Sequence, residues 1–395
     1  MAITQVPPAL LTSTTGTGTT VALSASPTFT GTVTTPGVTF SDASVQTAAA
    51  SPYVLKNRII NGAMVINQRA WTGTVVTDGT YTLDRFVAFS SVASKYSVSQ
   101  NAGSVTPPIG FSSYLGATSL AVTTLGASDY YVIAQRIEGY NIADLGWGTA
   151  NAKTITLSFW VYSSLTGTFG GSLQNGTQAR SYPYTYTIST ANTWTQISIT
   201  IAGDTSGTWS TTNTEGIGVY FGLGVGTTFS GTANAWGSAQ KFSATGATSV
   251  VGTNGATFYV TGVQLEIGSS ATPFERRLYN QELANCQRYA LILGLQQTNS
   301  VAGLGFAYTT TGFAAVVNYP VAMRTIPTFT QNGAWAANNA LGAVTLTGGS
   351  INTTYSSTLA ADLSFSAASG LVAATPYRLT AGTSAAGSLV FSAEL

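Results

Sequence analysis

Histidine does not occur among the 395 residues of this chain. Without histidine the chain cannot build the Ser-His-Asp and Cys-His arrangements of nucleophilic hydrolases, and it lacks the commonest metal ligand of proteins. Hydrolysis of a glycan by two carboxylates needs no histidine, so this enzymatic route stays open. We predict that the chain is not an enzyme and has no catalytic residue, no metal ligand and no cofactor.

Cysteine and long apolar runs are also scarce. Cys286 is the only cysteine, so no disulfide forms within the chain and no thiolate cluster holds zinc. Apolar runs such as residues 289–295 are far too short to cross a bilayer as a helix. We therefore expect the fold to be stabilised by packing, and we expect no membrane insertion.

Charged residues are scarce as well. Charged residues make up 7% of the chain, whereas soluble domains carry about 25%. The 14 basic residues form no run that would neutralise a row of phosphates, and the net charge is only +1, which predicts no nucleic-acid partner. So few solubilising groups favour a chain that buries much of its surface against identical subunits.

Strand-forming residues and glycine take the place of charge. The 43 glycines stand between runs rich in Thr, Val, Tyr and Phe, which suit the pleated surface of a sheet. Polar and apolar residues alternate in residues 154–161, 193–201, 217–223 and 257–265, the period of half-buried strands. We predict an all-β protein whose residues 51–277 form a jelly-roll β-sandwich.

The apolar period changes after the predicted sandwich. Tyr279, Leu283, Cys286, Ala290 and Leu293 follow one another at steps of four and three residues, which predicts a short helical connector over residues 278–294. The helix either lies on its own sandwich or joins a threefold contact. For the second case, Leu283, Cys286 and Ala290 are candidate oligomer contacts. Residues 272–275 have the form of a capping box with proline at the first helical position, and Asn280 is the other candidate cap.

Sequence patterns typical of strands also occur at both ends of the chain. Residues 295–395 contain short alternating runs with few charges and predict a second, smaller β domain. Residues 1–50 are too rich in Thr, Ser, Gly and Ala to bury a core alone. Alternation there predicts an extended segment of short strands that neighbouring chains complete. Phe29, Val33 and Phe40 are its candidate oligomer contacts.

Several runs resemble proteins of tailed bacteriophages. SPTFTGTVTTPGVTFSDASVQTAA from Ser26, NRIINGAMVINQRA from Asn57 and TGVQLEIGSSATPFERRLYNQELANCQRY from Thr261 are similar to tail fibre, or receptor-binding, and minor tail proteins. KTITLSFWVYSS from Lys153 and NTWTQISITIAGD from Asn192 resemble the jelly rolls of carbohydrate-binding modules. The resemblance implies a homotrimer in the virion tail, assembled in the host cytoplasm, with residues 295–395 as the distal tip.

Most acids stand close to an arginine in the sequence. Asp84, Glu138, Glu266, Glu275 and Glu282 each have one within a few residues, and we expect Arg–carboxylate pairs there. A hidden catalytic pair would be sought among the other acids, which are Asp129, Asp144, Asp204 and Glu215. The loops around Asp144 and Asp204 also have the composition of a calcium site, although ordinary Asp-containing turns explain them better.

Aromatic residues are the better functional lead, because sugars stack on flat rings while polar side chains direct their hydroxyls. The alternative for each ring is a place in the core or in a subunit contact. The candidate glycan-binding residues lie in polar loops, in the YPYTY run or in the distal domain. They are Trp147, Trp209, Trp236, Tyr182, Tyr184, Trp335 and Tyr355.

These observations predict a structural and adhesive virion protein. Its partners would be its own copies, other phage tail or virion proteins bound through the N-terminal segment, and host surface polysaccharide or lipopolysaccharide. Weak sites repeated around an axis gain strength by avidity. Two alternatives stay open: a structural fibre or decoration protein at the head, collar or baseplate that binds no receptor, and a tailspike glycan depolymerase with a carboxylate pair.

Overall fold

The computed structural model describes residues 38–39, 45–46, 56–294, 299–340, 342–382 and 387–395. Contacts between residues divide the chain into two compact units, Met1–Val54 and Leu55–Leu395. In the first unit, β1 (Val38–Thr39) pairs antiparallel with β2 (Val45–Gln46). The candidate oligomer contacts Phe29, Val33 and Phe40 lie outside the described residues.

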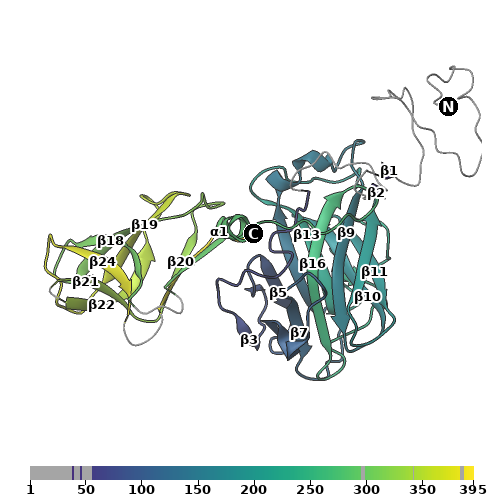
Figure 1. Ribbon diagram of the computed structural model, residues 1–395, viewed down its shortest axis with the longest axis horizontal. Coiled ribbons are helices and arrows are strands. Elements are labelled where there is room, and N and C mark those ends of the chain that lie inside the picture. Colours follow the sequence, from purple (N-terminus) through teal and green to yellow (C-terminus); the bar gives the residue numbers. More distant parts are fainter. Residues whose placement is uncertain (1–37, 40–44, 47–55, 295–298, 341, 383–386) are drawn as a thin grey trace, which may run out of the picture. The chain divides into compact units, whose positions relative to one another are not determined.

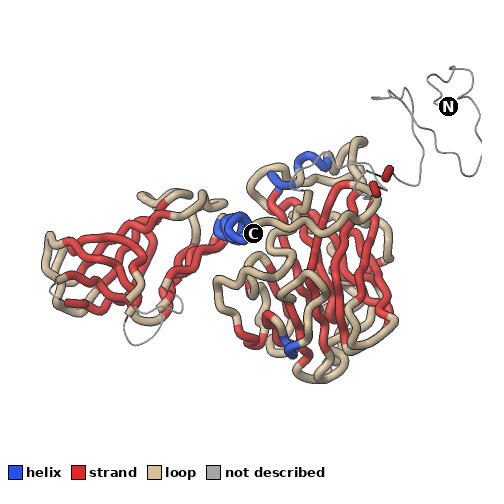
Figure 2. Tube along the Cα trace, in the orientation of Figure 1, coloured by secondary structure: helices blue, strands red, loops and turns tan. Residues whose placement is uncertain are grey.

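The second unit begins with a β-sandwich of two six-stranded sheets (Figure 1). The first sheet has the order β11 (Ser181–Ile188), β10 (Gly167–Asn175), β13 (Glu215–Val225), β8 (Tyr130–Glu138), β5 (Phe86–Ser90) and β4 (Thr80–Tyr81). The second has the order β12 (Thr195–Ile201), β9 (Ile155–Ser163), β16 (Thr257–Ile267), β7 (Leu115–Ser119), β6 (Tyr96–Gln100) and β3 (Thr72–Val75). The chain passes repeatedly between the sheets, and the all-β prediction is confirmed (Figure 2).

Alternation along the long strands builds the main core. In β9 the apolar Leu157, Phe159 and Val161 point into the sandwich, where each is at most 1% exposed, while Trp160 and Tyr162 point outward. A smaller core covers the outer face of the first sheet, beneath the parallel pair β14 (Ser230–Gly231) and β15 (Ser243–Ala244). Gly170 permits this layer to approach, because a Cβ there would lie 2.5 Å from the Ser243 Oγ.

The predicted helix is shorter than residues 278–294. Helix α1 spans Tyr279–Gln287, its N-cap is Leu278 without a side-chain hydrogen bond, and the chain is already extended in β17 (Ala290–Leu293). The capping-box prediction is wrong because the sandwich uses those groups. The backbone N–H of Thr272 donates to Glu266, and that of Glu275 donates to the Gln264 side chain.

The apolar stripe of the helix faces its own chain. Cys286 is fully buried against Ile60, Ile66 and Tyr289, and Leu283 packs on the same cluster. Ala290 is also fully buried, in strand β17. Cys286 and Ala290 are therefore buried within their own chain, and helix α1 packs on residues of its own sandwich.

The remaining residues form a closed six-stranded barrel with an attached sheet (Figure 1). The barrel order is β18 (Val301–Ala307), β19 (Gly312–Asn318), β23 (Ala360–Ser366), β22 (Gly342–Ile351), β21 (Trp335–Asn339) and β24 (Pro376–Ala381). The attached sheet has the order β17, β25 (Ser388–Ser392) and β20 (Thr328–Asn332). Both contribute to one hydrophobic core, separate from that of the sandwich.

Helices contribute little elsewhere. Among the described residues, three single 3-10 turns lie at Ala102–Ser104, Gly139–Asn141 and Ala143–Leu145. Within the described ranges, every helix is too short or too polar to cross a membrane.

Candidate functional site

Four of the predicted glycan-binding residues meet in one aromatic cluster. The ring centroid of Trp147 lies 4.7 Å from that of Trp209 and 5.3 Å from that of Trp236. Trp236 also lies 5.5 Å from Trp209 and 5.1 Å from Tyr182. The residues come from separate loops and from strand β11, so the fold brings together rings that are far apart in the sequence.

This cluster is a plug of the sandwich core. Trp147, Trp209 and Tyr182 are only 6–8% exposed, and the tryptophans meet edge to face, so that each ring covers its neighbour. The indole N–H groups of Trp147, Trp209 and Trp236 donate to the backbone oxygens of Lys153, Ser206 and Ala202. Trp147, Trp209 and Tyr182 have no broad ring face left for a sugar, and the prediction for these three is wrong. Trp236 is half-buried and stays a candidate.

The other predicted aromatic residues do not form a site together. Tyr184 is fully buried and its hydroxyl donates to the backbone oxygen of Tyr220. Trp335 is fully buried in the barrel core. Neither ring can stack on a ligand in this conformation. Tyr355 is 77% exposed and stays a candidate without an aromatic neighbour in the described part of the chain.

Eight carboxylates of the described residues are held in ion pairs. Asp204 accepts two hydrogen bonds from Arg180, each 2.7 Å long, and Glu138 is held by Arg288. The other six are Asp144 with Arg58, Glu215 with Arg136, Glu266 with Lys56, Glu275 and Glu282 with Arg277, and Glu394 with Arg69 and Arg85.

The choice of partners differs from the sequence prediction. Asp144, Asp204 and Glu215 form ion pairs, although the sequence places no arginine within a few residues of them. Asp84 has no ion pair among the described residues and accepts hydrogen bonds from Gln68 instead. Since Asp144 and Asp204 already bind arginines, their loops do not present free calcium ligands, and the described residues hold no cluster of three or more His, Cys, Asp or Glu suited to a metal.

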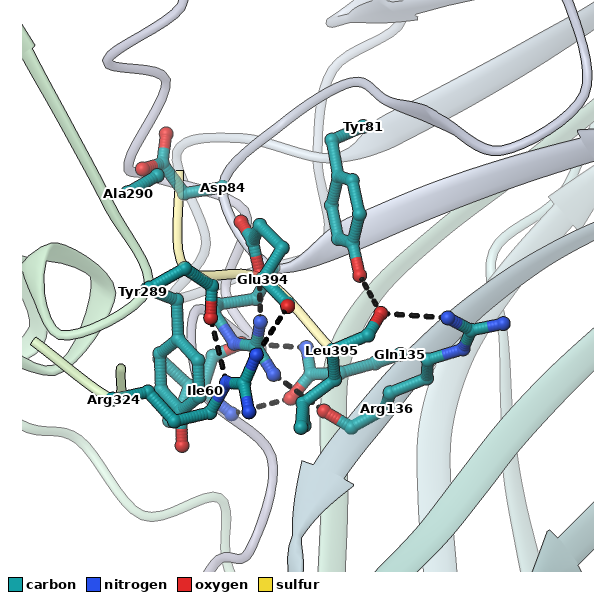
Figure 3. A network of polar contacts seen from close by, with 12 residues as sticks. Ile60, Tyr81, Asp84, Gln135, Arg136, Tyr289, Ala290, Arg324, Glu394 and Leu395 are labelled. Atoms are coloured by element: carbon teal, nitrogen blue, oxygen red, sulfur yellow. Dashed lines mark hydrogen bonds and ion pairs between the residues drawn. The ribbon is translucent and has the colours of Figure 1, made fainter. Parts of the chain in front are cut away.

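A polar network surrounds Glu394 and Leu395 (Figure 3). The buried Arg85 is part of it. Its guanidinium pairs with Glu394 and lies over the ring of Tyr289, 3.5 Å from the centroid. Leu395 is held from the sandwich, because its backbone oxygen accepts hydrogen bonds from Tyr81 at 2.7 Å and from Arg136 at 2.6 Å. The network fastens the segment after β25 to strands of the first sheet.

Burial controls the electrostatics of this network. It raises the pKa of Glu215 to about 7, against the opposing effect of Arg136 and Arg85. Burial likewise raises the pKa of Tyr81 to about 12, and the charge of Glu394 adds to the shift. These groups have their partners within the protein, so the network is structural and has no arrangement of an acid facing a base across an open cleft.

An accessible arginine and two aromatic rings lie elsewhere, beside the segment that precedes α1. The guanidinium carbon of Arg276 is 4.8 Å from the ring centroid of Phe111 and 5.7 Å from that of Phe274. The two rings are 5.2 Å apart in an edge-to-face arrangement. Arg276 is exposed and forms no ion pair or hydrogen bond with the described residues. We call these three residues the arginine–aromatic site.

A cavity of about 200 Å³ adjoins the arginine–aromatic site. Phe274, Arg276 and Tyr279 line it together with Ala63, Val65 and Glu282. Tyr279 is 60% exposed, so part of its ring faces solvent. Exposed rings stack on the apolar faces of sugars, and a free guanidinium fork donates to hydroxyl, carboxylate or phosphate oxygens. The chemistry of the site suits recognition of a saccharide.

The sequence alone does not indicate this site. Arg276 and Arg277 both follow Glu275 directly, so either could pair with the acids nearby. Arg277 binds Glu275 at 2.9 Å and Glu282 at 3.2 Å, whereas Arg276 points away and rests on Phe274 and Phe111. Two consecutive arginines are the sequence feature that relates to this site. Neighbouring residues on an extended segment point to opposite sides, so only one of the two can face the acids.

No family model matches this sequence, and no curated protein matches it. Among solved structures, the enzymatically active domain of bacteriophage CBA120 tailspike protein 4 is 13% identical with a TM-score of 0.29, covering 54% of this chain and 21% of that chain. TmCBM61 in complex with β-1,4-galactotriose is 9% identical with a TM-score of 0.28, covering 54% and 99%. The family 11 carbohydrate-binding module of Clostridium thermocellum, in complex with a β-1,3-1,4-mixed-linked tetrasaccharide, is 14% identical with a TM-score of 0.26, covering 51% and 99%.

Proposed function

We propose that this chain is a non-enzymatic, glycan-binding structural protein of a phage virion, a tail fibre that attaches the particle to host surface polysaccharide or lipopolysaccharide. The observation that carries the glycan-binding part is the arginine–aromatic site, where Arg276 rests on two rings beside a cavity of about 200 Å³. The sequence resemblance of the runs at Ser26, Asn57 and Thr261 supports the place in a phage tail.

The ligand is recognised by stacking and by charge. Phe274 and Tyr279 provide ring surface at the cavity, and the unpaired guanidinium of Arg276 provides donors at its rim. Arginine binds planar carboxylates and phosphates with two parallel hydrogen bonds, which makes anionic groups of an envelope glycan the favoured contact. A single site of this size binds weakly, and a homotrimer would add avidity.

Binding without hydrolysis is supported by the state of the acids. Eight of the carboxylates are ion-paired, and Asp84 is fully buried. The depolymerase alternative is best tested at Asp78 and Asp129, which accept hydrogen bonds from the neighbouring Ser90 and Ser91 and have no cation partner among the described residues. Loss of glycan cleavage in Asp78→Asn or Asp129→Asn would favour the enzyme.

The test is the affinity of the purified full chain for polysaccharide and lipopolysaccharide isolated from candidate hosts, measured by calorimetry. We expect Arg276→Ala and Phe274→Ala each to weaken binding about tenfold or more, which corresponds to about 1.4 kcal/mol. Tyr308→Ala is the matched control, because it removes a ring that is 52% exposed and is not a candidate glycan-binding residue, and Tyr355→Ala tests one of the two remaining candidates. If Tyr355→Ala abolishes binding while Arg276→Ala leaves it intact, the site is misplaced.

A further inference from the structure

Strand β12 is an edge strand of the second sheet, and its only strand partner in the described part of the chain is β9. An edge strand presents a row of unpaired backbone N–H and C=O groups. Natural proteins protect such edges by making the strand short, by covering it, or by placing charge or proline on it.

The other three edges of the sandwich are protected. Strands β3 and β4 have only 4 and 2 residues. Strand β11 contains Pro183 and is covered, since Ser181 and Gly237 exchange hydrogen bonds of 3.1 and 2.8 Å and the backbone N–H of Asn234 donates to the Pro183 oxygen. The absence of such devices on the fourth edge is therefore informative.

Strand β12 has none of these devices. Its 7 residues, Thr-Gln-Ile-Ser-Ile-Thr-Ile, include no charge and no proline. Gln196, Ser198 and Thr200 are exposed on the outer face, while Ile197 and Ile199 are half-buried at the margin of the core. A further strand beside β12 would pair the free backbone groups and would cover the two isoleucines.

The strand is nearly the same read in either direction from Ser198. If an identical strand lies antiparallel beside it with Ser198 opposite Ser198, then Ile197 lies opposite Ile199 and Gln196 opposite Thr200. Side chains directly opposite each other on one face set the stability and register of such a pair. Over residues 196–200 this register places apolar opposite apolar and polar opposite polar, with no like charges in contact, and Thr195 lies opposite Ile201 at the two ends.

We propose that β12 pairs with β12 of a second copy of this chain, antiparallel about a two-fold axis at Ser198, so that the two second sheets become one continuous sheet. The contact is isologous, because the same patch is used by both copies. The contact doubles the number of chains in the assembly that forms it, whether that assembly is a single chain or a trimer. It is separate from the arginine–aromatic site and does not depend on glycan binding.

The first test is the mass of the full chain in solution, measured by light scattering. We expect wild-type protein to have an even number of chains, and Ser198→Lys and Ser198→Glu each to have half that mass, because like charges then meet at the axis. An equimolar mixture of the two variants restores the larger mass. Thermal unfolding verifies that each variant is folded. An odd number of chains in wild type, or an unchanged mass in both variants, overturns the proposal.

The second test fixes the register with a new cysteine. Ser198→Cys places two thiols directly opposite each other, within reach of a disulfide, so mild oxidation gives a crosslinked dimer. Thr200→Cys is the matched control, since its counterpart lies four residues along the partner strand. The native Cys286 is fully buried and does not compete. Crosslinking of both variants to the same extent, or of neither, contradicts the pairing.

Discussion

Arg85 lies over the ring of Tyr289 with its guanidinium carbon 3.5 Å from the ring centroid, and the same guanidinium pairs with Glu394. Tyr289 follows helix α1 and Glu394 follows strand β25, so one side chain of the sandwich holds both segments. Arg85 is 1% exposed. A buried cation of this kind is stable only while its partners stay in place.

Replacement of Arg85 by Met is therefore expected to lower the free energy of unfolding by about 3–5 kcal/mol, because it leaves Glu394 buried without its main cation. Urea denaturation of Arg85→Met, Glu394→Gln and the double variant measures this. The double variant should lose less than the sum of the single variants, since neither charge is then stranded. Arg276→Ala, an exposed arginine, is the control and should change stability by less than about 0.5 kcal/mol. Additive losses would argue against a direct coupling.

Glu215 predicts the direction of a pH effect. Burial raises its pKa from an ordinary 4.5 to about 7, so between these values the folded protein holds a proton that the unfolded chain has released. The free energy of unfolding therefore falls as pH rises from about 4.5 to about 7, and this contribution is constant above pH 7. The total is about 3 kcal/mol at 1.4 kcal/mol for each pKa unit.

Urea midpoints of wild type and Glu215→Gln between pH 5 and pH 8 isolate this contribution. The glutamine variant is expected to lack that part of the slope, because its side chain does not titrate. Gln281→Ala, which removes an exposed side chain that does not titrate, serves as control and should keep the slope of wild type. Identical slopes in wild type and Glu215→Gln would show that Glu215 is ionised in the folded protein throughout.

Because the aromatic cluster belongs to the core, we expect replacement of one of its buried rings to lower stability without lowering glycan affinity. Trp209→Ala removes a buried ring that touches Trp147 and Trp236, and we expect a loss of about 3–5 kcal/mol in unfolding free energy. Glycan affinity, measured by calorimetry at a temperature where the variant is fully folded, should be unchanged. Phe274→Ala should show the converse pattern. Reduced affinity in folded Trp209→Ala would restore the cluster as a binding site.

Local periodicity was sufficient to predict four of the long strands, whereas β8 and β10 were not predicted. The alternating runs at 154–161, 193–201, 217–223 and 257–265 are strands β9, β12, β13 and β16 in the structure. The helix start was not predictable from its capping signals, because Thr272 and Glu275 donate to Glu266 and Gln264 of the preceding strand. Neither Thr272 nor Asn280 is the N-cap, because helix α1 begins at Tyr279 with Leu278 as its cap.

Most of the ion pairs could not be predicted from the sequence, because the paired residues are far apart along the chain. Glu138 stands two residues from Arg136 but binds Arg288, 150 residues away, and Arg136 binds Glu215. Antiparallel pairing of β8 with β13 produces the second contact, and no spacing in the sequence indicates it. Trp147 and Trp209 were predicted to bind a glycan, yet the loops that carry them pack on one another and bury both rings. The separate place of Arg276 follows from Arg277 binding both acids, which the sequence does not indicate.

Cys286 provides a final test of where helix α1 packs. Its side chain is fully buried beside Ile60, Ile66 and Tyr289, and burial raises its thiol pKa well above the ordinary value. Since only the thiolate reacts, we expect no modification by a thiol reagent at pH 8 in the folded protein and complete modification in 6 M guanidinium. Ser198→Cys, an exposed position, is the positive control and should react at once in the reduced protein. Rapid modification of Cys286 in folded wild type would mean that α1 leaves the sandwich readily, and the stripe of Leu283 and Cys286 would then be available to another subunit after all.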